Sequence, residues 1–589
     1  MFPIVAALLL AVACVGWLGY RALQVKDNLE SALALSSPVS KAVASGDLEK
    51  VQRQLDQMQQ HTSTARSAGT DPLWRVAGML PWIGANFAAA TDATVAADIT
   101  VSAVIPLLDS SGSLRPDLFT PKNGSFDVAA LSKASPQLAR AAATVESASD
   151  SVAAIHRDEL VPQLVQPLDE AGAALKSLTA ALSGASDASE ILPSMLGSEG
   201  ERNYLVLVQN NAEVRASGGI PGALVLLTAN EGALKLDDHG SASDIGRFKP
   251  ALEVDKEQEQ IYTTRLGSYM QNVNLTPDFP TAASTASRMW KAKNAGSDIN
   301  GVVSIDPVAL GYLLEATGPI KLDDLDSISA HLGSLPTTLS RENVVRTLLS
   351  DVYQEIEEPT LQDAYFAAVA GEVFSGLTDG DIDPSTMVKA LQKGAEERRL
   401  LVWSGEENEQ KVIADSALGG VIAGSADEPK IGVYFNDGTG AKMDYYVRRD
   451  VRLEKRCQPD GYYRYAVRTT ITNNAPADAG KTLPDYVTGA GAFGVKPGTV
   501  QTNIYAYGPT EWFLDAAARD GKAAPFGSYK HDARPVGAAT VRLAPGETTS
   551  IEFEFSTPYE TDEPKLDVTP TVQPTSSVLQ SSTAGEGCS

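Results

Sequence analysis

Apolar residues change their spacing several times along the chain, and each change marks a new kind of element. Residues 2–20 carry no charge and are followed by Arg21, a length close to the ~20 residues with which a helix crosses a bilayer. We interpret residues 1–24 as an uncleaved transmembrane anchor. A cleaved signal peptide is the alternative, but the apolar run is long and no basic residue precedes it. Lipidation is disfavoured because Ala11–Cys14 is a poor lipoprotein cleavage box.

Residues 25–197 are rich in alanine and follow a helical period. From Leu131 to Ile155 apolar residues recur at alternating spacings of three and four, and Leu168–Leu182 repeats this pattern. Small residues at alternate positions let helices pack closely, so we predict an antiparallel α-helical stalk or bundle. A partner-binding coiled coil is the alternative. For the proline-broken aromatic segment 72–84, we favour capping of the bundle core over a dip into the membrane interface.

Residues 198–400 alternate strands with helices, which predicts a central α/β domain. Residues 223–228 and 234–238 are expected to form a hairpin that turns at Asn230-Glu231-Gly232. Gly301–Ile305 is a short apolar strand. Asp306-Pro307 then opens a helix, because Asp caps a helix and Pro is favoured in the first turn.

From about residue 430 the apolar period changes to two. In residues 548–556, Ile551, Phe553 and Phe555 alternate with polar residues, so one face of this strand is buried and the other is wet. Regularly spaced strands with Pro and Gly turns predict an immunoglobulin-like β-sandwich over residues 401–559. Residues 560–589 are rich in Thr, Ser and Pro, and we expect an extended tail.

Charge and composition exclude several functions. The net charge of -26 argues against a nucleic-acid partner, since phosphate binding needs clustered Lys and Arg. The five histidines lack metal-ligand spacing, and the common phosphate-loop, hydrolase and metalloprotease motifs are missing. Gly489–Gly494 matches G-x-G-x-x-G but lies among strands, so we do not interpret it as a cofactor site. Cys457 and Cys588 are a candidate disulfide outside a reducing cytoplasm.

The strongest candidate site lies between the apolar strands Tyr204–Val208 and Ala223–Thr228. The intervening residues are polar and rich in glycine, which is typical of a loop-borne site on a rigid sheet. In one interpretation the asparagines cap the strand and the glycines supply left-handed conformations. In the other, an arginine and exposed backbone N–H groups bind a phosphate or carboxylate. The anion-site candidates are Asn210, Asn211, Glu213, Arg215, Ser217, Gly218, Gly219, Gly222 and Arg247.

Two further carboxylates could complete this site. Asp244 and Asp278 are candidate ligands for a divalent metal such as Mg²⁺, although each could equally be a cap or a surface charge. Glu213 suits an anion site only if it pairs with Arg215 or shares a metal with the ligand. The catalytic residues remain unassigned.

Four segments of the chain resemble a bacterial envelope family known as domain of unknown function 4012. They are NNAEVRASGGIPGA, NVNLTPDFPTAA, GVVSIDPVALGYLLEATGPIKL and VYFNDGTGAKMDYYV, which begin at residues 210, 272, 301 and 433. The resemblance implies a single-pass protein of the bacterial cell membrane, with most of the chain extracytoplasmic.

A more distant resemblance is to the LytR-CpsA-Psr family, which transfers glycopolymers from polyprenyl-pyrophosphate carriers to peptidoglycan. Residues 301–322 and the hairpin with Arg215 are similar to that family's active-site elements. The chain departs from the family at Gly219–Gly222, where an Asp-Thr pair is usual, and at Leu361–Tyr365, which offers no arginine.

The two resemblances imply a role in cell-wall biogenesis. The first hypothesis is that the protein binds a lipid-linked glycopolymer, or transfers it as a phosphotransferase. The alternative is a non-catalytic scaffold or interaction module that engages other envelope proteins. An apolar tunnel that opens near Arg215 would favour the first hypothesis. A filled core with Glu213 paired to Arg215 would favour the second.

Overall fold

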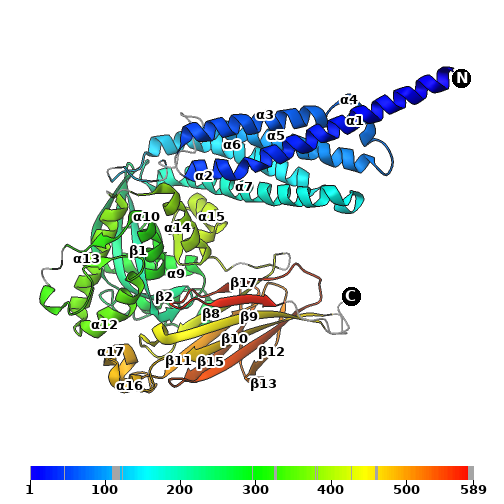
Figure 1. The fold of residues 1–589 in the computed structure, drawn as a ribbon. Helices are drawn as coiled ribbons and strands as arrows, with labels where there is room; N and C mark the ends of the chain where they lie inside the picture. The colour runs from blue at the N-terminus through cyan, green and yellow to red at the C-terminus, as the bar shows by residue number, and fades with distance from the viewer. Residues whose placement is uncertain are drawn as a thin grey trace. The chain divides into compact units, whose positions relative to one another are not determined.

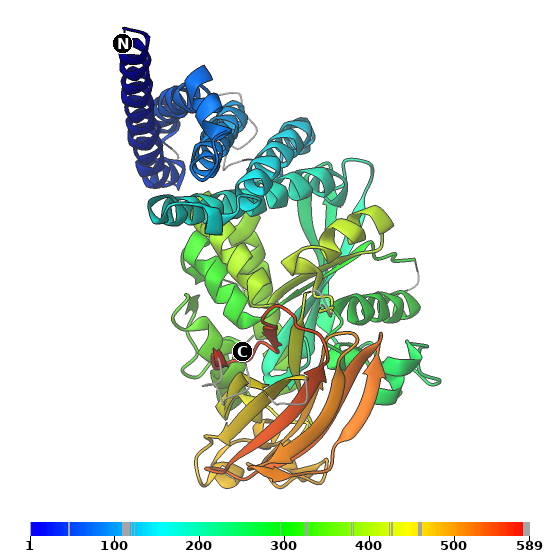
Figure 2. The same ribbon diagram turned by 90° about the vertical axis from the view of Figure 1, so that its right-hand side faces the viewer.

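The structure is a computed structural model that describes residues 2–44, 47–108, 118, 120–122, 124–294, 296–323, 325, 328–378, 380, 382–422, 424–425, 428–457 and 462–580. The chain forms two compact units, Met1–Gly200 and Glu201–Ser589. The first unit is helical, and the second combines three main sheets with helices (Figures 1 and 2).

The first unit is a bundle of helices, and the predicted helical period is confirmed. On α6, Leu131, Leu138, Val145 and Val152 are buried and line one face. Asp127 caps this helix by accepting a hydrogen bond from the Ala130 amide at 2.9 Å. The helices are α1 (Phe2–Ala34), α2 (Ser36–Ala44), α3 (Leu48–Gly69), α4 (Pro72–Gly78), α5 (Gly84–Leu108), α6 (Val128–Ala153) and α7 (Pro162–Met195).

One helix among the described residues is long and apolar enough to cross a membrane by length and composition. It is Gly84–Leu107 of α5, of which 33% is buried. This helix carries Asp98, which is buried and accepts hydrogen bonds from Gln59 at 3.1 Å and Arg66 at 2.8 Å. A buried carboxylate with such partners suits a helix inside a bundle.

The predicted anchor at residues 1–24 forms the first part of α1. Its side chains before residue 9, and those of residues 10 and 11, lie outside the described part of the structure. From Val12 to Tyr20 every side chain is exposed or half-buried. The anchor therefore stays a prediction, for which α1 supplies a continuous helix.

The second unit begins with a five-stranded mixed sheet in the order β3-β2-β1-β4-β7. The predicted hairpin is confirmed, and Glu231 and Gly232 turn it with φ values of 51° and 88°. The predicted strand and helix at residue 301 are also confirmed, with Asp306 accepting from the Ala309 amide at 2.8 Å. The strands are β1 (Arg202–Arg215), β2 (Gly218–Asn230), β3 (Ala233–Ser241), β4 (Gly301–Ile305) and β7 (Leu400–Ser404), the last of which crosses the predicted boundary at 400.

Helices and one short hairpin complete this part of the second unit. Trp290, Met289 and Phe279 of α9 are buried against the sheet residues Leu205 and Val302 in one apolar cluster. The elements are α8 (Lys256–Tyr262), α9 (Phe279–Lys293), α10 (Pro307–Thr317), β5 (Ile320–Lys321), β6 (Thr338–Leu339), α11 (Val344–Arg346), α12 (Val352–Glu355), α13 (Pro359–Thr378), α14 (Pro384–Glu396) and α15 (Glu407–Ala414).

Two further sheets form a β-sandwich around one core. Phe435, Val467, Ile504 and Phe553 come from both sheets and belong to one buried cluster. One sheet has the order β13 (Lys522–Ala523), β12 (Phe513–Arg519), β16 (Thr548–Thr557), β10 (Tyr463–Asn473), β9 (Val447–Cys457) and β18 (Ser576–Gln580). The other has the order β14 (Gly527–His531), β15 (Arg534–Leu543), β11 (Val500–Tyr507), β8 (Lys430–Asp437) and β17 (Lys565–Val568), and the short helices α16 (Ala479–Thr482) and α17 (Asp485–Thr488) lie between β10 and β11.

The segment expected to be an extended tail belongs to the sandwich. β17 pairs with β8 in parallel, and β18 pairs with β9 in parallel. Asp567 of β17 is buried, forms an ion pair with Arg398 at 3.0 Å and accepts a hydrogen bond from Tyr434 at 3.0 Å. Cys588 and the side chain of Cys457 lie outside the described part of the chain, so their disulfide stays a prediction.

Asp567→Asn should lower the free energy of unfolding by about 3 kcal/mol, because the variant leaves Arg398 buried without a counter-charge. Urea denaturation of the full chain measures this change. Asp562→Asn, at an exposed position before β17, is the matched control and should leave stability unchanged. Equal stabilities of the two variants would show that the Asp567 ion pair does not hold β17.

Candidate functional site

The expectation of a glycine-rich loop at the candidate site was wrong. These residues form a continuous hairpin. β1 runs to Arg215 and β2 starts at Gly218, so only two residues form the turn. Gln209 and Asn210, which follow the predicted strand Tyr204–Val208, continue β1 and pair with Pro221 and Ile220. A polar strand is stable here because its side chains find partners in other elements of the unit.

A bulge in β1 redirects the polar side chains of the site. The register passes from Asn210↔Ile220 to Val214↔Gly219, so the three intervening residues of β1 have no paired residue on β2. Bulges bend a strand and re-aim its side chains. Gly219 is required at this point, since a Cβ there would lie 2.2 Å from the Asn210 carbonyl carbon. Its amide donates to Gln209 Oε1 at 2.8 Å, so this amide is already used within the hairpin.

Glu213 lies in a buried charge network between two cations. Its carboxylate accepts from Arg215 Nη2 at 2.9 Å and from Lys442 Nζ at 3.1 Å. All three side chains are at most 10% exposed. Burial alone would raise the pKa of Glu213, but Lys442 and Arg215 together lower it below its usual range. The arginine that was expected to hold a ligand anion is thus paired with a carboxylate of the same strand.

Lys442 connects this hairpin to the sandwich. It follows β8, and its ammonium lies 5.6 Å from the Tyr353 ring centre and 5.4 Å from that of Tyr486. Burial lowers the pKa of a lysine, but here the charge of Glu213 outweighs it and raises the pKa of Lys442. The lysine therefore stays charged, with a carboxylate on one side and aromatic faces on the other.

A second buried ion pair lies beside the hairpin. Asp444 pairs with Arg449, which is 1% exposed, and accepts from the Val214 amide at 2.9 Å. Asn436 accepts from the Ala216 amide at 2.9 Å. The end of the hairpin is thus held by side chains of the sandwich.

Asp437 is the third carboxylate of this region and is the last residue of β8. It accepts hydrogen bonds from the Thr439 and Gly440 amides at 2.9 and 2.5 Å. Burial, followed by the charges of Asp444 and Glu213, raises the pKa of Asp437 to about 7. This carboxyl group therefore changes its charge near neutral pH.

Asp306 has a role that the sequence did not reveal. Besides capping α10, its carboxylate forms an ion pair with Arg399 at 2.7 Å and accepts from Asn211 at 3.0 Å. Arg399 also donates to the Thr571 carbonyl at 3.0 Å, which joins the central sheet to the segment after β17. The only sequence signal was an Arg-Arg pair directly before the apolar strand at residue 400.

The remaining anion-site candidates do not converge on Arg215. Asn210 donates to the Tyr353 hydroxyl, while Gly222 is exposed. Ser217 is 1% exposed, and its hydroxyl has no hydrogen-bond partner within the described chain. Gly218 has a φ of 138°, a value that favours glycine. Arg247 is exposed and its guanidinium lies 5.7 Å from the Tyr269 ring centre.

The metal candidates lie at separate structural positions. Asp244 is exposed and accepts from the Ser241 amide at 3.1 Å. Asp278 caps α9 through the Thr281 amide at 3.2 Å. In the part of the chain that the structure describes, no group of three or more His, Cys, Asp or Glu residues could hold a metal ion.

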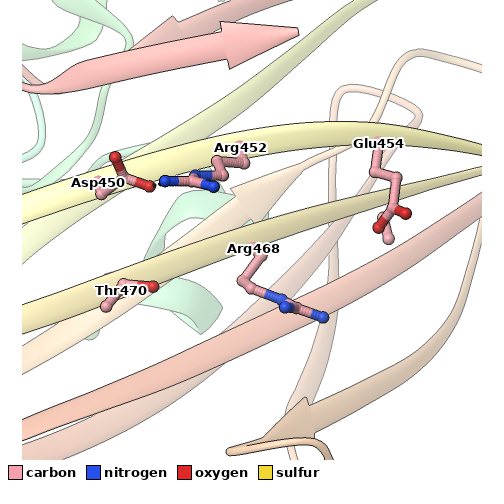
Figure 3. Close-up of a pocket in the computed structure, with 6 residues that line it drawn as sticks. Asp450, Arg452, Glu454, Arg468 and Thr470 are labelled. Atoms are coloured by element: carbon pink, nitrogen blue, oxygen red, sulfur yellow. Dashed lines mark hydrogen bonds and ion pairs between the residues drawn. The ribbon is translucent and has the colours of Figure 1, made fainter. Parts of the chain in front are cut away.

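Two cavities lie outside the hairpin. Figure 3 shows the first, of about 460 Å³, on β9 and β10 of the sandwich. Its cations are already paired, Arg452 with Asp450 at 2.8 Å and Arg468 with Glu552 at 2.7 Å, so this face is a self-compensated polar surface. The second, of about 290 Å³, is lined by Asp255, Glu257, Asp278, Val421, Ile422, His531, Asp532 and Arg534.

Residues 199–353 match the model of a family described as "Protein of unknown function (DUF4012)". The match covers β1 to α11 and the start of α12, and it supports the first family resemblance over this part of the chain. No curated protein matches the chain. A solved structure from Legionella pneumophila, provisionally described as a nutrient binding protein, has 9% identity and a TM-score of 0.14. It covers 23% of this chain, and the chain spans 44% of it, a similarity that carries no argument.

Glu213→Gln should lower the free energy of unfolding by about 3–5 kcal/mol, because Arg215 and Lys442 then lose their shared counter-charge. Denaturant titration measures the loss. Glu231→Gln, at the exposed tip of the neighbouring turn, is the control and should behave like the natural protein. An unchanged stability of Glu213→Gln would mean that the buried network does not hold the hairpin.

Asp437→Asn should remove a pH dependence of stability. The pKa of Asp437 in the folded protein, about 7, lies above its ordinary value of 3.8. Between these values the folded protein holds the extra proton, so stability falls as the pH rises from about 4 to about 7. We expect this fall in the natural protein and a flatter profile in the variant, in unfolding measurements from pH 4 to 8. Parallel profiles would contradict the assignment.

Proposed function

We propose that the protein is a non-catalytic scaffold of the bacterial cell envelope, held by a single membrane helix at its N-terminus. The observation that carries the proposal is the ion pair between Glu213 and Arg215. A carboxylate of the protein itself occupies the position at which an anionic ligand would bind. Buried charges need partners, and these partners are supplied from within the fold.

The surroundings of Arg215 support a structural role. Its side chain is 8% exposed, and its Nη1 also donates to the backbone carbonyl of Val214 at 3.1 Å. The Gly219 amide, which would have faced a phosphate, is bonded to Gln209 instead. A phosphate at Arg215 would therefore have to displace Glu213, and Lys442 would then need a new partner.

The resemblances support the proposed location and the finer fold assignments. We propose an envelope location because four segments of the chain resemble an envelope family. By the same analogy, we propose that the central sheet is related to LytR-CpsA-Psr domains and the sandwich to immunoglobulin-like domains. Fold similarity does not carry catalysis with it, so a scaffold on such a fold needs no transferase activity.

The competing function is the binding of a polyprenyl-phosphate carrier with Mg²⁺. We expect the full chain, purified in detergent, to retain no carrier in native mass spectrometry and to show no rise in melting temperature with added undecaprenyl phosphate, with or without Mg²⁺. Arg215→Met is the matched variant. A carrier that the natural protein retains and Arg215→Met loses would overturn the scaffold proposal.

A further inference from the structure

The segment from Leu73 to Ile83 presents an apolar surface to solvent. Between Arg75 and Asp92 the chain has no charged residue. Contiguous apolar surface of this kind marks an interaction site in soluble proteins. The exposed fractions are 38% for Leu73, 59% for Val76, 83% for Met79, 47% for Leu80, 95% for Trp82 and 50% for Ile83.

The expectation that this segment caps the bundle core holds for Trp74 and Ala77, the two buried residues of α4. Trp74 is 3% exposed, its ring centre lies 4.8 Å from that of Phe87, and its Nε1 donates to the Phe87 carbonyl at 3.0 Å. Trp82 is 95% exposed and contributes nothing to the core. The two tryptophans of the segment therefore have different roles.

The turn is built to hold Trp82 outward. A Cβ on Gly84 would lie 2.4 Å from the Gly78 carbonyl oxygen, so the two ends of the turn are in close contact. The Gly84 amide donates to the Leu80 carbonyl at 2.9 Å. Trp82 itself adopts a φ of 68°, a region that bulky residues rarely adopt. Strained conformations of this kind persist where the surrounding structure enforces them.

The base of this segment is fixed to α1. Asp71, which caps α4, accepts from Trp17 Nε1 at 3.3 Å and from Arg21 Nη2 at 3.1 Å. The Arg21 guanidinium also lies 4.7 Å from the Trp17 ring centre. The segment thus lies beside the point at which the predicted membrane helix ends.

Toward its N-terminus, α1 extends past the other helices of its unit (Figure 1). Leu9, Val12 and Val15 are 66%, 65% and 69% exposed, and a Cβ on Gly16 or Gly19 would meet nothing within 4 Å. A helix that is apolar all round and has no protein cover is typical of a helix in lipid. Nineteen residues rise ~28 Å, close to the ~30 Å of bilayer hydrocarbon.

We infer that the Leu73–Ile83 turn docks on the lipid bilayer beside α1, with Trp82 and Met79 at the boundary between head groups and acyl chains. The inference rests on the proposed membrane attachment of α1. If residues 2–20 span the bilayer, Trp17, Tyr20 and Arg21 reach its surface, and Asp71 fixes the start of the segment beside them. Tryptophan is enriched at this depth.

Lipid fits this surface better than a second copy of the chain does. The turn is continuous with the uncovered part of α1, which needs the same environment. A net charge of -26 opposes close approach of two copies, and it opposes anionic head groups as well. Zwitterionic lipid is therefore the expected partner. Two contact points, α1 and the turn, would fix the tilt of the helical unit on the membrane.

Tryptophan quenching by brominated lipid tests the inference in the full chain. The protein is reconstituted in phosphatidylcholine nanodiscs with and without dibrominated acyl chains. Trp82→Phe and Trp17→Phe each remove one reporter and keep an apolar side chain. Trp290→Phe, 5% exposed in the second unit, is the control. We expect Trp82→Phe and Trp17→Phe each to remove about half of the quenchable emission, and Trp290→Phe to remove none.

Each other outcome overturns the inference in a distinguishable way. If only Trp17→Phe reduces quenching, α1 is in the bilayer and the turn is not, so the inference fails and the membrane attachment stands. If neither variant reduces quenching, the membrane attachment fails with it. If Trp82 is unquenched and each nanodisc holds two copies, a second copy covers the turn.

Discussion

A buried carboxylate is the constraint on which the second unit depends. Glu213 comes from the central sheet, and one of its two cations, Lys442, comes from the segment that follows the first strand of the sandwich. Transfer of a charged group from water into the protein interior costs several kcal/mol unless the group is paired and hydrogen-bonded. The sheet and the sandwich therefore hold each other in one relative position, because separating them would part the buried Lys442 from Glu213. The same network occupies Arg215, to which a ligand anion was expected to bind.

The C-terminal segment is also held by buried charged side chains, at two further contacts. Asp567 pairs with Arg398, and the Thr571 carbonyl accepts from Arg399, so two adjacent arginines hold one returning segment. Thr569 adds a hydrogen bond to the Ala216 carbonyl at 2.8 Å, directly at the hairpin turn. Charged and hydrogen-bonded contacts have strict geometry, whereas apolar contacts tolerate sliding. These contacts therefore fix the orientation of the C-terminal segment at this junction, in addition to the surface that it buries.

Local structure was predictable because its causes are local. The cap at Asp306, the glycine turn at residue 232 and the alternation at 551–555 each depend on neighbours in sequence. The burial of Arg215 was not predictable, since Lys442 lies more than two hundred residues away in sequence. The strands of the C-terminal segment were missed for a related reason. Their register is set by partners such as Arg398, while their own Thr, Ser and Pro composition shows no period.

A fold whose central cations are neutralised from within must act through its surface. The pocket on β9 and β10 is lined by charged side chains that pair with one another or with a neighbouring strand (Figure 3). The turn that carries Trp82 differs, because a 95% exposed tryptophan in an uncharged stretch gains nothing from water. Selection for solubility would replace it with a polar residue. Its presence beside an uncovered apolar helix is explained if both lie in the same lipid environment.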